Sequence, residues 1–226
     1  MLEVIVAKKP DVVIMMGPFV DMKNPTVLSS SESFDKQWIN RLALIGEKVA
    51  GLSCQVILVP SARDAVGYPV YPQPPFPSSS HCPPNIKCVS DPAILDIAGV
   101  QVGLTSTDIL FHLGKEEICF PPRSGDRMSR LASHILQQGS FYPLYPPSEE
   151  VNVDIEKLES FALLEQAPHV MILPSDLNNF VRAVQGTTVI NPGRLTKGVG
   201  PGTYSVFRLR KGQDGRPETR VQIMRI

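Results

Sequence analysis

The chain has 226 residues, of which 42% are hydrophobic and 19% are charged, a composition typical of a globular protein with room for one large or two small domains. Its 22 lysines and arginines balance its 22 aspartates and glutamates, so no global field attracts nucleic acid or an anionic membrane. No apolar run approaches the roughly 18 residues that a membrane-spanning helix needs, and the first residues lack the order of a signal peptide, so we expect a protein of the cytosol or nucleus.

The first quarter of the chain predicts a strand, a helix and a second strand. Residues 11–16 form a short, almost continuous apolar run that ends at Gly17, which is typical of a buried parallel strand. A helix is expected over 34–50, with Ser33 as its N-cap. Its apolar stripe consists of Trp38, Leu42, Ile45 and Val49. Residues 55–59 are again apolar, and this order of elements favours an α/β sheet with parallel strands.

A long loop is predicted over residues 60–84, because this segment holds eight prolines. Three aromatic residues of the loop, Tyr68, Tyr71 and Phe76, are spaced as if to pack it onto the body of the protein. A proline-rich ligand for an SH3-type domain is the alternative interpretation of the sequence VYPQPPFP.

Hydrophobic runs and turn residues predict the elements of the second half. They are a β-hairpin over 93–106, helices near 107–113 and 127–138, a strand over 169–174, a short helix over 176–184 and a strand over 187–193. We expect Ser124 and Gly139 to bound the helix at 127–138, and the acidic stretch after Pro147 to be helical. Residues 203–211 and 218–226 are predicted to form a closing hairpin with alternating faces, joined around Asp214 and Gly215.

Positive charge gathers in the last 24 residues, where six basic residues against two acidic ones give six minus two, or +4. They are Arg208, Arg210, Lys211, Arg216, Arg220 and Arg225, against Asp214 and Glu218. A solvated sheet edge that discourages pairing between sheets is one explanation. A direct DNA-binding module that uses this hairpin is the alternative.

The four cysteines form no C-x-x-C motif, and we expect them to be reduced thiols. They are Cys54, Cys82, Cys88 and Cys119. A metal knuckle formed by Cys82 and Cys88 with His81 is the alternative, although zinc sites usually use cysteines that are closer in sequence.

Three of the predicted strands are followed by polar motifs, namely GPFVD, PSARD and PSDL. In open α/β sheets the functional residues collect just beyond the carboxyl ends of the strands. The spacing of these motifs resembles that of the calcineurin-like metallophosphoesterases. The resemblance implies an α/β fold in which a two-sheet sandwich is flanked by helices.

The same resemblance implies that the metal ligands of that family are replaced in this chain. Pro18 stands where a metal-bridging aspartate belongs, while Ala62 and Arg63 stand where a ligand asparagine and the catalytic histidine belong. Ser175 and Leu177 occupy the positions of two late histidines. Proline, alanine and leucine offer no side-chain ligand, so we expect a degenerate site without catalytic residue, metal or cofactor.

Two acidic residues survive at these strand ends, Asp21 and Asp64. In the family that the motifs resemble, residues at these positions flank the metal ligands. We therefore expect Asp21 and Asp64 to brace the loops by hydrogen bonds.

A longer set of motifs resembles the B-subunits of DNA polymerase alpha–primase. In chain order the motifs are GPFVD, VPSARD with VYPQPPF, GLTSTDILFHLGKEEI, YPLYPP, ILPSDLNNFV and VINPGRLTKG. The residues of this fingerprint are Gly17, Phe19, Ser61, Tyr71, Pro72, Pro74, Asn191, Pro192 and Gly193. The B-subunits of polymerases delta and epsilon share GPF and PS-x-RD, but the other motifs favour alpha.

This resemblance implies a non-catalytic scaffold of DNA replication initiation in the nucleus. Such a scaffold binds the C-terminal, zinc-bearing region of the polymerase catalytic subunit and helps to tether primase. Contact with DNA would be indirect or weak, and no membrane partner is implied. Residues 1–226 would then form the C-terminal phosphoesterase-like domain, without the upstream oligonucleotide-binding-type domain and the first strand of the fold, and MLEVIVAKKPD would belong to a helix.

Two further functions stay open from the sequence. One is the B-subunit of another replicative polymerase. The other is a working metal-dependent phosphoesterase with substitute ligands such as Asp21, Asp64 and Asp176.

Overall fold

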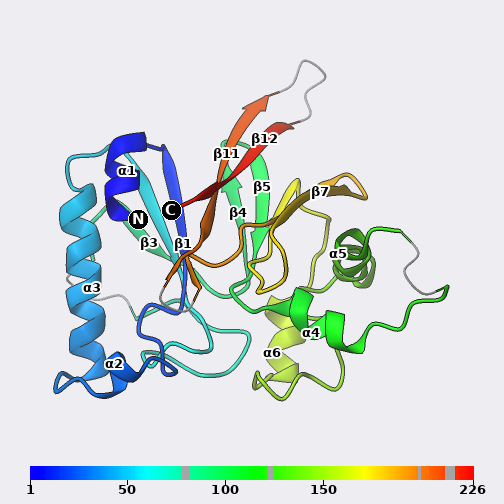
Figure 1. Ribbon diagram of the computed structural model, residues 1–226, viewed down its shortest axis with the longest axis horizontal. Helices are drawn as coiled ribbons and strands as arrows, with labels where there is room; N and C mark the ends of the chain where they lie inside the picture. Colours follow the sequence, from blue (N-terminus) through cyan, green and yellow to red (C-terminus); the bar gives the residue numbers. More distant parts are fainter. Residues whose placement is uncertain (78–81, 122–124, 198–199, 212–216) are drawn as a thin grey trace. The chain divides into compact units, whose positions relative to one another are not determined.

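A computed structural model describes residues 1–77, 82–121, 125–197, 200–211 and 217–226 (Figure 1). The chain is a mixed α/β protein that divides into two compact units. Unit 1 comprises Met1–Asp91 with Val151–Asp154, and unit 2 comprises Pro92–Glu150 with Ile155–Ile226. In the described part of the chain, no helix has the length and hydrophobicity that crossing a bilayer requires.

Unit 1 is built on a three-stranded parallel sheet with the strand order β1-β2-β3. Its strands are β1 (Val12–Met16), β2 (Gln55–Val59) and β3 (Ile86–Cys88), and its helices are α1 (Leu2–Lys8), α2 (Pro25–Leu28) and α3 (Phe34–Val49). The strand, helix and parallel strand expected from the sequence are therefore confirmed. Strand β3 was not expected, because it has three residues and directly follows the proline-rich segment.

Helix α3 contributes four buried apolar side chains to the core of unit 1. It begins after Ser33, whose hydroxyl accepts the backbone N–H of Lys36 at 3.3 Å, as predicted. The predicted stripe is buried in the unit 1 core, to which α3 contributes Trp38, Leu42, Ile45 and Val49. Full burial of one such side chain stabilises the fold by roughly 1.5–3 kcal/mol.

The proline-rich loop lies on unit 1 through two of its three aromatic side chains. Tyr71 is fully buried, and its backbone N–H donates to the carbonyl of Asn152 at 2.8 Å. Phe76 stacks on Trp38 with a ring-centroid distance of 4.2 Å. Tyr68 contradicts the prediction, since 69% of it is exposed. The loop turns Tyr71 and Phe76 inward while Tyr68 stays in solvent, so the spacing of the aromatic residues alone did not decide their burial.

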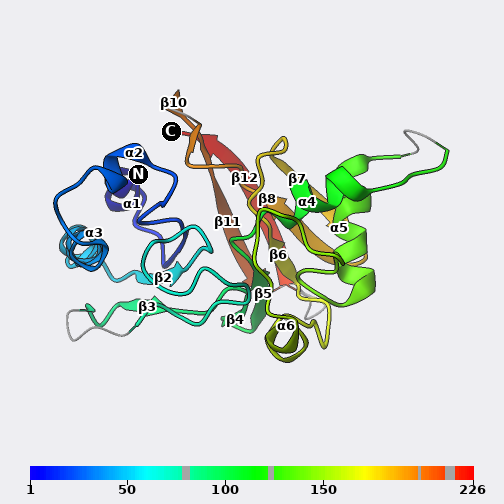
Figure 2. The same cartoon turned by 90° about the horizontal axis from the view of Figure 1, so that it is seen from below.

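Unit 2 contains a five-stranded sheet with the order β4-β5-β6-β8-β7. Its strands are β4 (Ala93–Ile97), β5 (Val100–Leu104), β6 (Val170–Ile172), β7 (Phe180–Val184) and β8 (Thr187–Asn191). The central strands β5, β6 and β8 are parallel, and both edge strands are antiparallel to their neighbours. Figure 2 shows this sheet from below. The predicted hairpin over 93–106 and the strands near 169–174 and 187–193 are confirmed.

Three helices belong to unit 2, namely α4 (Ile109–Glu116), α5 (Arg127–Gln138) and α6 (Ile155–Phe161). Helix α5 has the predicted bounds and ends at Gly139, which has the left-handed φ of 61°. Its N-cap is Asp126, whose carboxylate accepts the N–H of Ser129 at 3.2 Å. Ser124, the predicted boundary residue, lies outside the described residues. The acidic stretch after Pro147, predicted to be helical, is helical only in its later part, which forms α6.

The short helix predicted over 176–184 is wrong, because residues 180–184 form strand β7. This strand pairs with β8 through a two-residue turn. Both turn residues have positive φ, 50° at Gln185 and 85° at Gly186, as a hairpin turn of the primed type requires. Pairing with β8 outweighs the weak helical pattern of the segment.

The chain closes with two small sheets in unit 2. One joins β9 (Thr196–Lys197) to β10 (Gly200–Pro201). The other is the predicted hairpin, an antiparallel ribbon of β11 (Thr203–Lys211) and β12 (Pro217–Arg225). Its connection around Asp214 and Gly215 lies outside the described residues.

Candidate functional site

The loops that follow β1 and β2 are joined by the carboxylate of Asp64. Its Oδ1 accepts the backbone N–H groups of Phe19 at 2.6 Å and Val20 at 2.7 Å, and its Oδ2 accepts the N–H of Ser61 at 3.1 Å. Parallel strands bring their carboxyl ends to one edge of the sheet, which explains how residues 45 positions apart meet here. Asp64 therefore fixes both loops at the carboxyl edge of the sheet.

The environment of Asp64 raises the pKa of its carboxyl group to about 6. Burial is the main cause, because removal from water disfavours the charged form. The hydrogen bonds from Val20, Phe19 and Ser61 oppose this effect, and the nearby charge of Asp21 adds to it. Burial therefore disfavours the charged form of Asp64, and three backbone hydrogen bonds partly offset this effect.

An ion pair between Asp21 and Arg63 lies beside this carboxylate. Arg63 Nε donates to Asp21 Oδ1 at 3.2 Å, and Arg63 Nη2 contacts Asp21 Oδ2. The two loops also exchange backbone hydrogen bonds, such as that from Met22 N–H to the Arg63 carbonyl at 3.0 Å. Asp21 and Asp64 therefore both brace the loops, as expected.

The remaining predicted positions of unit 1 lie in the same two loops. Pro18 and Ala62 are half-buried, and neither side chain has an atom that could coordinate a metal. Gly17 and Ser61 are buried between the loops. A Cβ at Gly17 would overlap the carboxylate of Asp64 and come within 3.0 Å of the Ser61 backbone nitrogen, so this close approach requires glycine.

In unit 2, the side chain of Asn191 has the same bracing role after β6 and β8. Its Oδ1 accepts the N–H groups of Ser175 at 3.0 Å and Gly193 at 2.8 Å, and its Nδ2 donates to the carbonyls of Leu177 and Asn178, each at 3.2 Å. These contacts use its amide oxygen and nitrogen twice each. Two predicted site positions, Ser175 and Leu177, are therefore held by a residue that the sequence identified only as part of a fingerprint.

Arg194 connects two aspartates near this loop. Its Nη2 lies 3.1 Å from Asp108 Oδ2, and its Nε lies 3.0 Å from Asp176 Oδ1. The same Asp108 oxygen accepts the Asp176 backbone N–H at 2.7 Å. Asp176, considered as a substitute ligand, is thus paired with an arginine. No local pattern indicated this cluster, since 86 positions separate Asp108 from Arg194.

The other fingerprint residues have structural positions. Pro72 is buried and Pro74 is exposed on either side of Gln73, whose backbone pairs with that of Asp91. Pro192 accepts a hydrogen bond from the Thr203 hydroxyl at 2.7 Å. Gly193 has a φ of 75°, a conformation that favours glycine.

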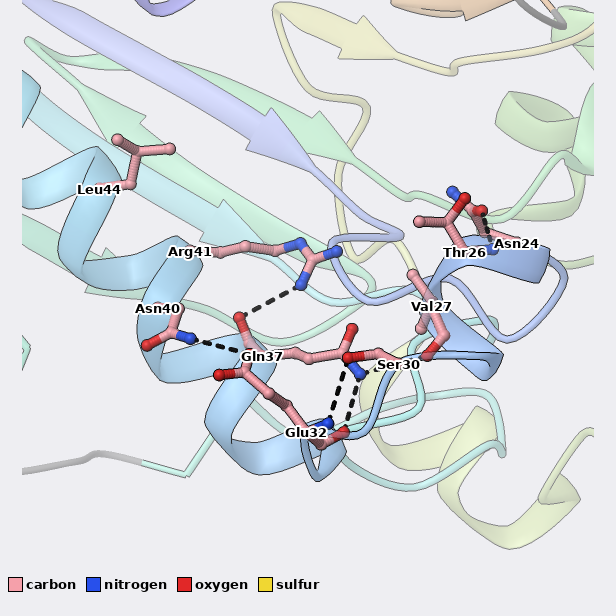
Figure 3. Close-up of a pocket in the computed structure, with 9 residues that line it drawn as sticks. All are labelled: Asn24, Thr26, Val27, Ser30, Glu32, Gln37, Asn40, Arg41 and Leu44. Carbon is pink, nitrogen blue, oxygen red and sulfur yellow. Dashed lines mark hydrogen bonds between the residues drawn. The ribbon is translucent and has the colours of Figure 1, made fainter.

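A surface pocket of about 360 Å³ lies elsewhere in unit 1, between α3 and the segment around α2 (Figure 3). Seven of its nine lining residues are polar or charged, and the lining comprises Asn24, Thr26, Val27, Ser30, Glu32, Gln37, Asn40, Arg41 and Leu44. Gln37 spans it by donating to the carbonyls of Val27 at 3.2 Å and Glu32 at 3.1 Å. None of the predicted site residues lines this pocket.

Among the described residues, no three His, Cys, Asp or Glu side chains are grouped as a metal site would require. His81, the third member of the conceivable knuckle, lies outside the described residues. Cys82 and Cys88 are free thiols in unit 1. Burial and the neighbouring Cys82 raise the pKa of the Cys88 thiol to about 11.

Comparison with known proteins gives a consistent set of relatives. A sequence profile of the family of DNA polymerase alpha/epsilon B-subunits matches residues 1–182. The chain is 44% identical to the DNA polymerase alpha B-subunit of Rattus norvegicus over 216 residues, which cover 92% of this chain and 35% of the relative. It is 39% identical to the protein of that name from Drosophila melanogaster over 209 residues, which cover 92% of this chain and 34% of the relative.

The chain spans about a third of the length of these curated relatives. Among solved structures, Vps29 of Chaetomium thermophilum matches with a TM-score of 0.32 and 10% identity, covering 95% of this chain and 96% of that chain. A similarity of this size supports no inference.

Proposed function

The chain belongs to the family of DNA polymerase alpha/epsilon B-subunits, and from this premise we propose that it is a non-catalytic scaffold of the DNA polymerase alpha–primase complex. It binds the C-terminal region of the catalytic subunit in the nucleus and, through it, holds the primase subunits near the polymerase. The relatives from rat and fruit fly are named as alpha subunits, which favours alpha over the other replicative polymerases.

The observation that carries this proposal is the use of the charged side chains after β1, β2 and β6. Asp64 accepts three backbone hydrogen bonds, Asp21 pairs with Arg63, and Asp176 pairs with Arg194. Two divalent cations about 3.7 Å apart repel by roughly 18 kcal/mol at an effective dielectric constant near 20, and only anionic or imidazole ligands offset this cost. Carboxylates that already accept backbone hydrogen bonds or pair with arginines are poorly placed to serve as ligands of two metal ions.

We also propose that residues 1–226 form the phosphoesterase-like domain of this subunit, with a degenerate calcineurin-like fold. The parallel pair β1 and β2 with α3 between them supports it, as do the parallel strands β5, β6 and β8. In this assignment, Pro18, Ala62 and Leu177 replace metal ligands with side chains that cannot coordinate a cation.

Co-purification tests the scaffold role. The 226-residue chain is expressed with the C-terminal region of the polymerase alpha catalytic subunit, and the expected result is one species with equal amounts of both chains. The matched controls are the C-terminal regions of the delta and epsilon catalytic subunits, which should elute separately. A complex with one of these and not with alpha would overturn the assignment to alpha.

A hydrolysis assay tests the non-catalytic part of the proposal. The chain is incubated with a chromogenic phosphodiester and Mn²⁺, and we expect the rate of the buffer alone. Turnover that disappears when Asp21, Asp64 and Asp176 are replaced by alanine would contradict the proposal and would favour a phosphoesterase with substitute ligands.

A further inference from the structure

The ribbon of β11 and β12 has one polar face that is open to solvent. Along β11, Arg208 and Arg210 are exposed, whereas Phe207 and Leu209 beside them are half-buried. Over residues 218–223 of β12 the exposed residues are Glu218, Arg220 and Gln222, and the half-buried ones are Thr219, Val221 and Ile223. Because strand side chains alternate between two faces, the exposed residues share one face, which we call the arginine face.

The arginine face carries three arginines and one glutamate, so its net charge is three minus one, or +2. Arg208 lies directly opposite Arg220, and Arg210 lies opposite Glu218. Like charges directly opposite each other on neighbouring strands destabilise a sheet. The ribbon therefore tolerates an electrostatic cost that a bound anion would remove.

Other arginines of this chain have carboxylate partners, as Arg63, Arg130 and Arg194 do. Within the described residues, neither Arg208 nor Arg220 takes part in an ion pair. Their guanidinium groups remain exposed and available to a ligand from outside. Guanidinium groups bind phosphate with two parallel hydrogen bonds, which makes phosphate a fitting ligand.

The spacing of these charges fits a polymer of phosphates. Residues two apart on a strand lie about 6.7 Å apart, and directly opposite residues lie about 5 Å apart. A strand of duplex DNA carries one phosphate for about every 3.4 Å of helix axis, and the major groove admits a two-stranded ribbon. We propose that the arginine face of the β11–β12 ribbon binds the phosphodiester backbone of nucleic acid.

Binding by the 226-residue chain can be measured by fluorescence anisotropy with a labelled DNA of about 20 base pairs, at salt concentrations from about 50 to about 200 mM. Three phosphate contacts predict a slope of log K against log salt near −2.7. Replacing Arg208 and Arg220 together by glutamine should bring the slope to about −0.9. Over the fourfold rise in salt, the affinity of the double variant should then fall by a factor about twelve times smaller than that of the parent chain.

The matched control is Arg225→Gln. Arg225 is an exposed arginine of the same ribbon, but it lies opposite Thr203 and belongs to the other face. This variant should keep the parent slope.

A second test raises the charge of the arginine face. Glu218→Gln changes this charge from +2 to +3 and should tighten binding at low salt. It tests the proposal even if the double arginine variant fails to fold.

Single-stranded DNA of the same length distinguishes which form of nucleic acid is bound. Loss of two phosphate contacts should change the slope of log K against log salt by about 1.4 on a single strand and by about 1.8 on a duplex. Absence of salt-dependent binding, or an unchanged slope in the double variant, would overturn the proposal. It would also be overturned if labelled polyglutamate lost affinity in the double variant while DNA did not, since an acidic protein would then be the ligand. The test is independent of the scaffold role, because association with the catalytic subunit is measured separately.

Discussion

The carboxylate of Asp64 accepts the backbone N–H of Phe19 at 2.6 Å and so fastens the loop after β2 to the loop after β1. In the phosphoesterase-like fold that we propose, this edge is where the catalytic family would hold two metal ions. Here the buried carboxylate holds backbone in place, and the charge of its neighbour Asp21 is taken up by Arg63. The charged side chains at this edge therefore hold the two loops together.

Replacement of Gly17 by alanine should disrupt this arrangement. The new Cβ would overlap the Asp64 carboxylate, which three hydrogen bonds prevent from moving away. We expect a loss of about 1–3 kcal/mol in the free energy of unfolding, measured by urea denaturation. Gly51→Ala is the control, since a Cβ there meets no atom within 4 Å, and it should leave stability unchanged or slightly raised. Equal effects of the two substitutions would show that the close approach at Gly17 is unimportant.

Asp64 should also make the stability of the protein depend on pH. Its pKa is about 6 in the folded chain, against 3.8 for the free side chain, so between these values the folded state binds more protons than the unfolded state. The stability that protonation of Asp64 contributes is therefore fully present below about pH 4 and is lost as the pH rises through about 6. The shift corresponds to about 3 kcal/mol.

The measurement compares the parent chain with Asp64→Asn, which keeps the shape of the side chain and cannot ionise. The free energy of unfolding of the parent relative to the variant should decrease between about pH 4 and about pH 7. An increase over this range would mean that the three backbone hydrogen bonds outweigh burial and hold the pKa below its ordinary value.

The sequence predicted the elements that local patterns determine. Helix α3 and the hairpin of β4 and β5 were located correctly, because the apolar spacing of the helix and the turn of the hairpin lie within the segments themselves. Strand β7 was predicted as a helix, because its conformation depends on pairing with β8 and on positive φ at Gln185 and Gly186. Such pairing is not visible in the segment alone.

The candidate site shows the same limit. The bracing role of Asp64 could be expected, since the residue follows a strand end in a motif of known spacing. The role of Asn191 could not, because its partners at Ser175, Leu177 and Asn178 come from a loop 13 to 16 positions away. Likewise, no spacing rule separates buried Tyr71 from exposed Tyr68.

Replacement of Asn191 by aspartate should destabilise unit 2. The amide nitrogen that donates to the carbonyls of Leu177 and Asn178 would become an oxygen facing two acceptors. Loss of these bonds and burial of a charge should cost about 3 kcal/mol or more, seen as a lower urea midpoint. The control is Asn179→Asp at an exposed position of the same loop, with an expected change within about 0.5 kcal/mol. A comparable loss in the control would indicate a general effect of negative charge near this loop.

Phe76→Ala should show whether the proline-rich loop contributes to the core of unit 1. The ring of Phe76 stacks on Trp38 at 4.2 Å and meets Phe19 at a centroid distance of 5.7 Å, so its removal leaves a cavity among aromatic side chains. We expect a loss of about 3–5 kcal/mol in the free energy of unfolding. Because Trp38 is the single tryptophan of the chain, its fluorescence should also shift to longer wavelength as water reaches it.

Tyr68→Ala in the same loop is the matched control. With 69% of Tyr68 exposed, its removal should change stability by less than about 0.5 kcal/mol and leave the tryptophan emission unchanged. If Phe76→Ala were equally silent, the loop would not be held by its aromatic residue, and its prolines would be available to a partner. The pair of variants therefore separates a loop that packs on its own protein from one that serves as a ligand.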